Sequence, residues 1–524
     1  MRDVAALTHA DADWGGLRVV VAGLGISGFA AADALLQRGA AVTVVDDRTG
    51  DDPGHGAQVA RDAELVDVLG GTTVLGPGSS GSLPDVAGRA PDLVVTSPGW
   101  RPSTPLLAAA ADRGVPVWGE VELAWRLRPR TGAAPWLTLT GTNGKTTAVK
   151  MLEAMLLASG RRAVAVGNVG TPLLHAVVDP RGYDVLAVEL SSFQLHWSHS
   201  LRPQASACLN LAPDHVDWHG SYEAYRDAKA KVYASTERAC VYNVEDPVTE
   251  QMVRDADVVD GARAIGFTTG VPDVSMLGVV DDVLCDRAFL AERRSSAVEL
   301  ATLDDLRHAG GGVVAPHTVA NALAAAALAR AHGVSTLAVR DGLWAMRPEP
   351  HRISTVAERD GIRWVDDSKA TNPHAAAASL AAFEHVVWVA GGLAKGADYA
   401  DLVRRNASRL RAVVLVGVDR DPLREALARH APDVPVHEVA HPDTGAVPVA
   451  DTVMARAVDH AARLARPGDV VLLAPAAASM DQFVSYGHRG EVFADAVRAH
   501  LAAVDALFTE DGDDDAPTDG PGAG

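Results

Sequence analysis

Short runs of apolar, mostly β-branched residues recur along the chain, and each is followed by an alanine-rich stretch with helical spacing. Continuous apolar runs, unlike alternating ones, are typical of strands buried on both faces of a parallel sheet. The pattern therefore predicts an α/β fold. The predicted strands, with the residues that end them, are 17–25, 41–47, 92–99, 136–141, 184–192, 362–370, 385–392, 412–417 and 469–477.

Two polar stretches that contain proline, residues 126–135 and 347–352, interrupt this pattern and are interpreted as joints between domains. The length of 524 residues favours about three or four domains. Residues 509–524 contain six acids, no base and no apolar run, which predicts a disordered acidic tail.

Composition narrows the function classes. The chain has no apolar run of about eighteen residues or more, and acids near its start occupy the place of a signal peptide's basic region, so we expect a cytoplasmic protein with no membrane partner. A formal charge of −20 disfavours a nucleic-acid partner. Cys208, Cys240 and Cys285 lack the spacing of a zinc site or a disulfide framework.

Lysine is scarce in this chain, since only six of its 47 basic residues are lysines. A biased coding background is one explanation. Arginine, however, cannot act as a compact point charge or as a nucleophilic amine, so each retained lysine invites a chemical interpretation. The six are Lys145, Lys150, Lys229, Lys231, Lys369 and Lys395.

Residues 140–147, TGTNGKTT, follow a predicted strand and open a helical stretch. Such a loop directs backbone N–H groups and a helix N-terminus at phosphate, while Lys145 reaches the terminal phosphates and Thr146 offers a hydroxyl to Mg²⁺. The complete phosphate-loop pattern is not met, because Leu139 stands where its first glycine belongs. A glycine-rich turn with an incidental lysine is the alternative.

Residues 23–28, GLGISG, place Gly23, Gly25 and Gly28 in the spacing of a dinucleotide fingerprint, and Asp46 ends the next predicted strand. The glycines allow close backbone approach to a diphosphate, and the acid suits a ribose. A tight turn without a ligand and a different nucleotide diphosphate both remain open at this point, and Arg48 suits a ligand with further hydrogen-bonding edges.

Two acid- and histidine-containing segments follow the phosphate loop. Glu189 ends an apolar strand, where a carboxylate without a partner is costly and Mg²⁺ is a natural compensation. Residues 213–229 contain His215 and then Lys229 on a helical run. A helix-capping Glu189, a structural His215 and a surface Lys229 are the plain alternatives.

Near the C-terminus, DDSKATN at 366–372 and GGLAKG at 391–396 each follow a predicted strand and each contain a lysine. Because the carboxyl ends of parallel strands meet at one edge of a sheet, these loops favour a shared anionic ligand. Two polar turns without a ligand are the alternative.

Taken in order, these motifs resemble those of the Mur ligase family of bacterial peptidoglycan synthesis, from about residue 17 to about residue 500, and most closely those of its D-glutamate-adding member. The further segments that carry the resemblance are TSPG, VGNVG, ELSSFQL, PDHVDWHGSYEAYRDAK, VDDSKATNP and LLAPAAASMDQFVSYGHRGEVF. Several correctly ordered motifs are a specific signal, whereas any one alone is weak.

The resemblance implies three domains: a Rossmann-like domain for the UDP-substrate at 1–119, a central ATPase-like domain with a mostly parallel sheet at 120–347, and a Rossmann-like domain for the amino acid at 348–505, before a disordered tail at 506–524. It also implies a cytoplasmic, monomeric enzyme. Its substrates would be ATP, D-glutamate and UDP-N-acetylmuramoyl-L-alanine, joined through an acyl phosphate with two Mg²⁺ ions.

The resemblance implies site residues by motif position. The UDP-substrate would contact Ser27, Asp46, Arg48, Gly99, Asn168 and His215. ATP would contact Gly141, Thr142, Asn143, Gly144, Lys145, Thr146, Thr147, Asn321, Arg352 and Asp367. D-glutamate would contact Lys369, Thr371, Lys395, Ser479, Met480 and Tyr486. One Mg²⁺ would bind Thr146 and Glu189, and the second His215 and Lys229 in carbamylated form.

On this interpretation Lys145, His215 and Lys229 are the catalytic residues. Lys145, Lys229, Lys369 and Lys395 would be retained because anionic oxygens meet around magnesium and a carboxylate in one site, whereas Lys150 and Lys231 have no role. The segment APHTVAN, 315–321, departs from the family's pattern at Ala315 and Thr318 but keeps Asn321.

Three competing functions remain at the level of sequence. A sister ligase for another amino acid, or a folylpolyglutamate synthetase, shares the central phosphate loop. An NAD-dependent dehydrogenase fits GLGISG with Asp46 but leaves the second loop unexplained. A non-catalytic nucleotide-binding module is disfavoured because Glu189, His215 and Lys229 are all present.

Overall fold

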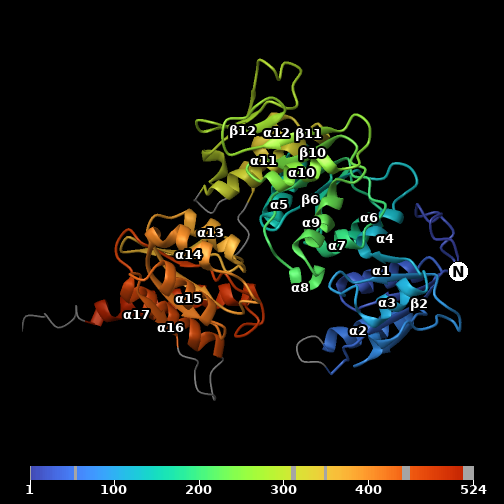
Figure 1. Cartoon of the computed structure of the whole chain (residues 1–524), viewed down its shortest axis with the longest axis horizontal. Helices are drawn as coiled ribbons and strands as arrows, with labels where there is room; N and C mark the ends of the chain where they lie inside the picture. Colours follow the sequence, from blue (N-terminus) through green and yellow to red (C-terminus); the bar gives the residue numbers. More distant parts are fainter. Residues whose placement is uncertain (1, 52–55, 308–313, 347–350, 440–448, 511–524) are drawn as a thin grey trace, which may run out of the picture. The chain divides into compact units, whose positions relative to one another are not determined.

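The computed structural model describes residues 2–51, 56–307, 314–346, 351–439 and 449–510, with only the backbone for 449–450 and 506–510. The chain divides into two compact units, Met1–Asp305 with Val319–Met346 and Leu306–Thr318 with Arg347–Gly524. Three sheets run through these units (Figure 1), and the predicted α/β fold is confirmed. Of the predicted tail, residues 511–524 lie outside the described residues, and the last helix continues to Glu510.

The first sheet has five parallel strands in the order β3-β2-β1-β4-β5. Val19 and Val21 of β1 pack in one core, and Val20 and Ala22 pack in another. Both faces are therefore covered, which explains the continuous apolar run. The elements are β1 (Arg18–Ala22), α1 (Ile26–Leu36), β2 (Ala41–Asp46), α2 (Gly56–Val68), β3 (Thr72–Leu75), β4 (Leu93–Thr96), α3 (Pro105–Asp112), β5 (Val117–Gly119) and α4 (Glu120–Arg126).

The second sheet has nine strands in the order β14-β13-β12-β11-β10-β9-β6-β8-β7, parallel except that β13 runs antiparallel to both of its neighbours. Its strand β6, the third from one edge, precedes the glycine-lysine loop, and the neighbouring strand β8 ends at Glu189, which lies in register with Leu139. The sheet therefore brings Glu189 beside the start of the loop.

The strands of the second sheet are β6 (Trp136–Thr140), β7 (Ala163–Gly167), β8 (Val185–Glu189), β9 (Ala205–Cys208), β10 (Ala239–Asn243), β11 (Arg263–Phe267), β12 (Met276–Val280), β13 (Val283–Asp286) and β14 (Val298–Thr302). The helices between and after them are α5 (Lys145–Ala158), α6 (Leu173–Val177), α7 (Ser192–His196), α8 (Val216–His219), α9 (Tyr222–Ala230), α10 (Pro247–Asp255), α11 (Pro316–His332) and α12 (Thr336–Ala345).

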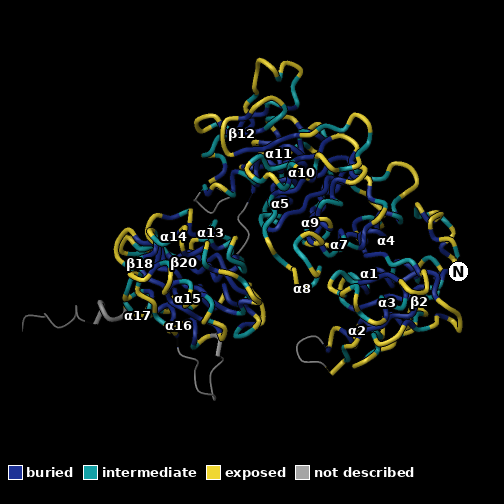
Figure 2. The backbone as a smooth tube through the Cα atoms, in the orientation of Figure 1, coloured by how far each residue is buried: buried dark blue, intermediate teal, exposed yellow. Residues whose placement is uncertain are grey.

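The third sheet has six strands in the order β15-β16-β20-β17-β18-β19, with only β15 antiparallel to its neighbour. Trp388 and Ala390 of β17 pack on one face, and Val387 and Val389 pack on the other. Figure 2 shows the resulting buried strands at the centre of this unit. Both lysine-containing loops follow strands, β16 and β17, that pair with β20.

The elements of the third sheet are β15 (Ser354–Arg359), β16 (Ile362–Asp366), α13 (Pro373–Ala381), β17 (Val386–Gly391), α14 (Ala400–Asn406), β18 (Leu410–Val416), α15 (Asp421–His430), β19 (Val436–Glu438), α16 (Val449–Leu464), β20 (Val470–Leu473) and α17 (Tyr486–Glu510). Each strand predicted from the sequence is a strand here. Within the described ranges, no helix combines the length and the apolar character that a membrane span requires. The domain boundaries at 119 and 347 stay predictions.

Candidate active site

The glycine-lysine loop, residues 141–144, connects β6 to α5. Gly144 caps α5 with a φ of 82°, a conformation that glycine adopts without strain. The loop is held by a distant segment, because the N–H of Thr142 donates to the carbonyl of Asn210 (3.0 Å) and the N–H of Asn143 donates to the Asn210 side chain (2.9 Å). This strand-loop-helix geometry is the kind that binds phosphate.

Lys145 lies over this loop. Its Nζ donates to the carbonyls of Gly141 and Thr142, both at 2.9 Å. Thr146 and Thr147 follow it in the first turn of α5. Asn321 of α11 contacts the same loop, since a Cβ added at Gly144 would lie 2.4 Å from its Oδ1. The predicted ATP residues of this unit therefore lie together, and a phosphate would replace the carbonyl partners of Lys145.

Glu189 is buried at the end of β8, and its two carboxylate oxygens differ. Oε1 accepts a hydrogen bond from Asn168 Nδ2 at 2.8 Å, whereas Oε2 is buried without a hydrogen-bond partner. A buried anionic oxygen without a partner is costly, and a cation compensates it. The carboxylate therefore fits a magnesium ligand, and Asn168 fixes its orientation; the predicted contact of Asn168 with the UDP-substrate stays a prediction.

Lys229 is not a surface lysine, since it is only 2% exposed on α9. Its Nζ donates to the carbonyl of Gly141 (2.7 Å) and to Thr140 Oγ1 (3.2 Å). Burial, reinforced by the charge of Lys145, lowers the pKa of the Lys229 amine to about 7. Part of the amine is therefore neutral near pH 7, and the neutral amine is the form that adds CO₂.

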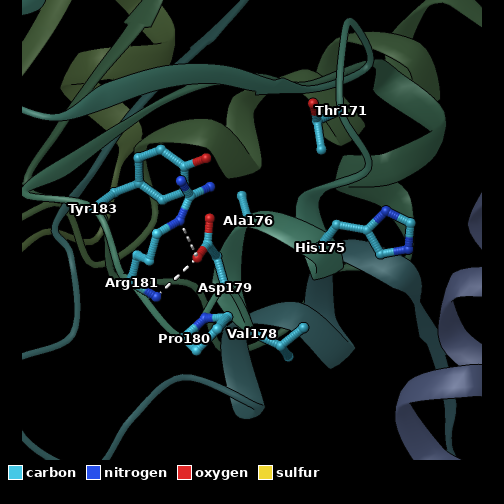
Figure 3. Close-up of a pocket in the computed structure, with 8 residues that line it drawn as sticks. All are labelled: Thr171, His175, Ala176, Val178, Asp179, Pro180, Arg181 and Tyr183. Atoms are coloured by element: carbon cyan, nitrogen blue, oxygen red, sulfur yellow. Dashed lines mark hydrogen bonds and ion pairs between the residues drawn. The ribbon is translucent and has the colours of Figure 1, made fainter.

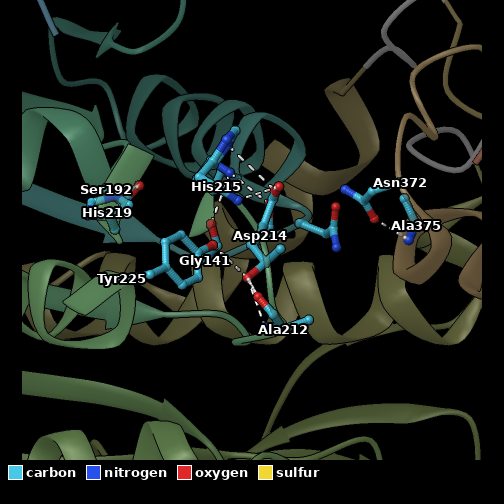
Figure 4. A network of polar contacts seen from close by, with 12 residues as sticks. Gly141, Ser192, Ala212, Asp214, His215, His219, Tyr225, Asn372 and Ala375 are labelled. Carbon is cyan, nitrogen blue, oxygen red and sulfur yellow. Dashed lines mark hydrogen bonds and ion pairs between the residues drawn. The ribbon is translucent and has the colours of Figure 1, made fainter. Parts of the chain in front are cut away.

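His215 caps the short helix α8 with a φ of 51°. Its ring packs on Phe193, with centroids 4.7 Å apart, and its Nε2 lies 3.5 Å from Asp214 Oδ2 (Figure 4). Burial lowers the pKa of His215, and the charge of Asp214 opposes this shift. A largely neutral imidazole is the form that binds a metal ion.

The first glycine loop is organised around Asp46. The carboxylate of Asp46 accepts hydrogen bonds from the N–H of Leu24 (2.6 Å) and from the guanidinium of Arg48 (2.7 Å). Burial alone would raise the pKa of Asp46, but the bonds from Arg48 and Leu24 outweigh it and lower the pKa. Asp46 thus holds Arg48 beside the loop, where a Cβ added at Gly25 would lie 3.8 Å from Arg48 Nη2.

Ser27 and Gly99 have partners that the sequence did not reveal. Ser27 Oγ donates to Glu120 Oε2 at 3.2 Å. The carbonyl of Gly99 accepts a hydrogen bond from Trp218 Nε1 at 3.2 Å. The loop at Gly99 is therefore connected to α8, the helix that His215 caps.

In the second unit, Asp367 is buried just after β16, where Ser379 Oγ donates to its carboxylate. Burial raises the pKa of Asp367 to about 7, against the opposing effects of Ser379 and of the Arg352 charge. The predicted ATP residues Arg352 and Asp367 therefore affect each other electrostatically.

The predicted D-glutamate residues lie on three loops of this unit and, for Tyr486, at the start of α17. Lys369 Nζ lies 3.7 Å from the centroid of the Tyr486 ring, and the N–H of Thr371 donates to the carbonyl of Lys369 (2.8 Å). The loop of Lys395 and the loop of Ser479 and Met480 are joined by paired backbone hydrogen bonds between Leu393 and Ala478 (2.9 and 3.1 Å).

Buried Arg489 connects two of these loops to the start of α17. Its guanidinium donates to Ser368 Oγ (2.9 Å), the Ser368 carbonyl (2.8 Å) and the Ala477 carbonyl (3.2 Å). Ser368 Oγ in turn donates to the carbonyl of Tyr486 (2.8 Å). The candidate residues are divided between the two compact units.

Sequence reasoning missed Glu120, Asn210, Trp218 and Arg489. Glu120 had a usable signal, because it is an acid directly after a short strand, the same feature that singled out Glu189. The other residues act through side chains on partners far away in the sequence. Within the described ranges, no group of three or more His, Cys, Asp and Glu side chains is arranged for a metal ion.

A separate hollow of about 460 Å³ lies beside α6 and contains none of the predicted residues (Figure 3). Its Asp179 already contacts Arg162 at 3.0 Å and Arg181 at 3.5 Å, so we assign it no ligand. The hollow is lined by Thr171, His175, Ala176, Val178, Asp179, Pro180, Arg181 and Tyr183.

Among solved structures, the fold is similar to UDP-N-acetylmuramate-alanine ligase from Thermotoga maritima, with a TM-score of 0.52 at 18% identity over 93% of this chain and 100% of that one. It is also similar to a type C pseudomurein peptide ligase from Methanothermus fervidus, with a TM-score of 0.53 at 16% identity over 92% of this chain and 100% of that one. At these identities the likeness concerns the fold alone.

Sequence comparison is more specific. UDP-N-acetylmuramoylalanine–D-glutamate ligase of Streptomyces avermitilis is 57% identical over 93% of this chain and 99% of its own length. The enzyme of the same name from Leifsonia xyli is 53% identical over 95% of this chain and 95% of its own length. The one from Mycolicibacterium smegmatis is 47% identical over 95% of this chain and 98% of its own length.

Three family descriptions match consecutive parts of the chain. They are the MurD-like N-terminal domain of Mur ligases at residues 17–119, the Mur ligase middle domain at 139–329 and the Mur ligase glutamate ligase domain at 351–477. Since these matches and the close relatives span nearly the whole sequence, the chain belongs to the Mur ligase family.

Proposed function

We propose that this chain is an ATP-dependent ligase that adds D-glutamate to UDP-N-acetylmuramoyl-L-alanine in cytoplasmic peptidoglycan precursor synthesis. The observation that carries the proposal is the 57% identity, over 99% of its length, to a relative named for this reaction. The retained lysines, Glu189 and His215 support it, because each provides a group that the chemistry requires.

In the proposed reaction, the carboxylate of the L-alanyl group attacks the γ-phosphate of ATP and forms an acyl phosphate and ADP. The amine of D-glutamate then attacks the acyl carbon, and phosphate leaves. The chain's own contribution is positioning and charge stabilisation, since phosphoryl transfer requires little covalent chemistry from the protein.

Each candidate residue of the first unit has a role in the proposed reaction. Gly141, Thr142, Asn143 and Gly144 shape the loop around the phosphates, Lys145 neutralises them, and Thr147 and Asn321 complete the ATP contacts. Ser27, Asp46, Arg48, Gly99 and Asn168 orient the UDP-substrate, and His215 faces its reacting end. These contacts hold the carboxylate in line with the γ-phosphate, which is the main requirement of the first step.

The residues also fit two magnesium ions, which would neutralise the crowded phosphate and carboxylate oxygens. Thr146 and the unpartnered Oε2 of Glu189 fit one ion. His215 and carbamylated Lys229 fit the other, because an amine with a pKa of about 7 can be neutral and take up CO₂ to become an anionic oxygen ligand.

In the second unit, Arg352 and Asp367 would contact ATP, and D-glutamate would contact Lys369, Thr371, Lys395, Ser479, Met480 and Tyr486. The two ammonium groups suit the two carboxylates of D-glutamate. We propose that residues 1–119, 120–347 and 348–505 hold the UDP-substrate, ATP and D-glutamate respectively, and that the enzyme is a monomer.

The test is an assay of phosphate release with ATP, UDP-N-acetylmuramoyl-L-alanine and, in parallel, D-glutamate, L-alanine, L-lysine or meso-diaminopimelate. Of the four amino acids, we expect only D-glutamate to support phosphate release. Release with another amino acid, or only with UDP-N-acetylmuramate as acceptor, would indicate a sister ligase. The variant Lys145→Ala is the control, since it should fold and release no phosphate. A change in nicotinamide absorbance with NAD would instead support a dehydrogenase.

A further inference from the structure

Glu120 is a buried carboxyl group behind the first glycine loop, and the proposed chemistry does not use it. It begins α4 and is 2% exposed. One oxygen, Oε1, accepts a hydrogen bond from the N–H of Leu174 at 3.1 Å. The other, Oε2, lies 3.2 Å from Ser27 Oγ. The carboxyl group thus connects α6 to Ser27 in the first turn of α1.

The environment of Glu120 shifts the carboxyl group towards its neutral form. Burial raises the pKa of Glu120, and the hydrogen bonds from Leu174, Ser27 and Leu173 only partly oppose the rise. No charged side chain contributes to the shift among the described residues. The titratable groups on α4 and on the helices that pack against it are Glu122 and Arg126 on α4, Asp33 on α1, His175 on α6 and His196 on α7.

The pKa of Glu122, two residues further along α4, is shifted in the opposite direction. Burial would raise the pKa of Glu122, but hydrogen bonds from Ser200, His199 and Arg126 outweigh it and lower the pKa. The Arg126 Nε lies 2.6 Å from its carboxylate. One short helix therefore contains a buried acid whose pKa is lowered and a buried acid whose pKa is raised.

The protonation of Glu120 decides where the single proton of the Ser27 hydroxyl points. When Glu120 is ionised, both of its oxygens are acceptors, so Ser27 must donate to Oε2. When Glu120 is protonated on Oε2, it donates to Ser27 Oγ, and the Ser27 proton is released for another acceptor. That acceptor would lie at the N-terminus of α1.

This helix end suits a diphosphate. Its first-turn N–H groups have no carbonyl partner within the helix, and the glycines of the loop allow close backbone approach. The guanidinium of Arg48 lies beside Gly25. We infer that Glu120 is a proton-linked positioning residue, which in its neutral form donates to Ser27 Oγ and thereby directs the Ser27 hydroxyl to the diphosphate of the UDP-substrate. The inference rests on the proposed function.

The test is calorimetric titration with UDP-N-acetylmuramoyl-L-alanine from about pH 5.5 to about pH 8.5, where the ligand's diphosphate diester and carboxylate do not titrate. Repeating it in two buffers of different ionisation enthalpy measures proton uptake. For the natural chain we expect affinity to fall with rising pH, by at most about tenfold per pH unit, and uptake of up to about one proton.

Glu120→Gln imitates the protonated state, because its amide can donate to Ser27 Oγ while its carbonyl accepts from Leu174. We expect it to bind tightly with little dependence on pH. A protein loses stability as a buried acid whose pKa rises on folding becomes ionised. The melting temperature of Glu120→Gln should therefore exceed that of the natural chain, and the difference should be larger at high pH than at low pH. This difference also shows that the variant folds.

Two further variants separate the proposed role from a general effect of charge. Ser27→Ala should bind more weakly and lose the pH dependence. Asp33→Asn, which removes a charge from α1 at a carboxylate bonded to Gln37 (2.7 Å), should keep the pH dependence of the natural chain. Affinity that is flat with pH in the natural chain, or an unchanged slope in Glu120→Gln or Ser27→Ala, overturns the inference. Failure of the natural chain to bind at any pH overturns the proposed function instead.

Discussion

The amine of Lys229 shares a carbonyl acceptor with a second amine, that of Lys145. Both donate to the carbonyl of Gly141, at 2.7 and 2.9 Å. Two cations so close repel each other, and burial adds a desolvation cost, so the more buried one tends to lose its proton. The two lysines without a proposed role have ordinary partners, because Lys150 pairs with Glu153 (2.9 Å) and Lys231 donates to the carbonyl of His196 (2.8 Å).

At the scale of a single residue, we predict that Lys229 takes up CO₂. With ¹³C-labelled bicarbonate, the carbon resonance of a carbamate should appear in the natural chain. It should grow as the pH rises through about 7, since only the neutral amine reacts and its fraction increases above its pKa. In Lys229→Ala the resonance should be lost and turnover should fall by at least about a hundredfold, because a ligand of the proposed metal site is missing.

Lys231→Arg is the matched control for this experiment. It should keep both the resonance and the turnover, because the Lys231 amine donates to the carbonyl of His196, a bond that a guanidinium can also make. Near-normal turnover of Lys229→Ala, or its recovery in high bicarbonate, would contradict the carbamate.

At the scale of one element, α5 has a glycine in the left-handed region at each end. Gly144 precedes it with a φ of 82°, and Gly160 follows it with a φ of 79°. Their surroundings differ, because a Cβ at Gly144 would meet the Asn321 side chain at 2.4 Å, whereas nothing lies within 4 Å of a Cβ at Gly160. Replacing each glycine with alanine therefore distinguishes the effect of backbone strain, which both positions have, from the effect of a clash with Asn321, which only Gly144 has.

We predict that Gly160→Ala lowers the free energy of unfolding by about 1 kcal/mol, through strain alone. Gly144→Ala should cost about 1 to 3 kcal/mol and should also abolish tight nucleotide binding, because Asn321 or the loop must move. Urea unfolding and titration with ADP measure the two effects. Equal nucleotide affinity in both variants would contradict the proposed contact of Asn321 with the loop.

At the scale of the whole molecule, the second unit has the cores that independent folding requires. Its six-stranded sheet is covered on both faces, and Trp388 is fully buried with its Nε1 donating to the carbonyl of Ala474 at 2.7 Å. Lys369 and Lys395 belong to this unit and Lys145 and Lys229 to the other, so their sharing of one site stays a prediction.

We predict that a fragment comprising residues 351–510 folds by itself and unfolds in one cooperative transition, measured by circular dichroism in urea. Trp388→Ala in this fragment should lower the free energy of unfolding by about 3 to 5 kcal/mol, because it leaves a cavity in the core. The exposed substitution Val418→Ala, at a side chain that is 52% exposed, is the control and should have little effect. A fragment without a cooperative transition would show that the unit needs the rest of the chain.

The sequence alone determined the main architecture and the motifs, because both depend on local patterns. Strands buried on both faces are mostly apolar, so β1, β17 and β20 were visible as continuous runs. Two other strands were missed, because β13 has only four residues and no residue of β15 is fully buried. The candidate site was found where residues end or follow a strand, as Glu189 and Lys145 do.

Tertiary structure decided the contacts that set the chemistry. The Lys229 amine reaches the carbonyl of Gly141, and Ser27 reaches Glu120, from positions 88 and 93 residues away. Whether a lysine is neutral, or a carboxyl keeps its proton, depends on burial and on such partners. A pattern of neighbouring residues contains neither the burial nor the partners of a side chain, because both arise only when distant segments pack around it and exclude water.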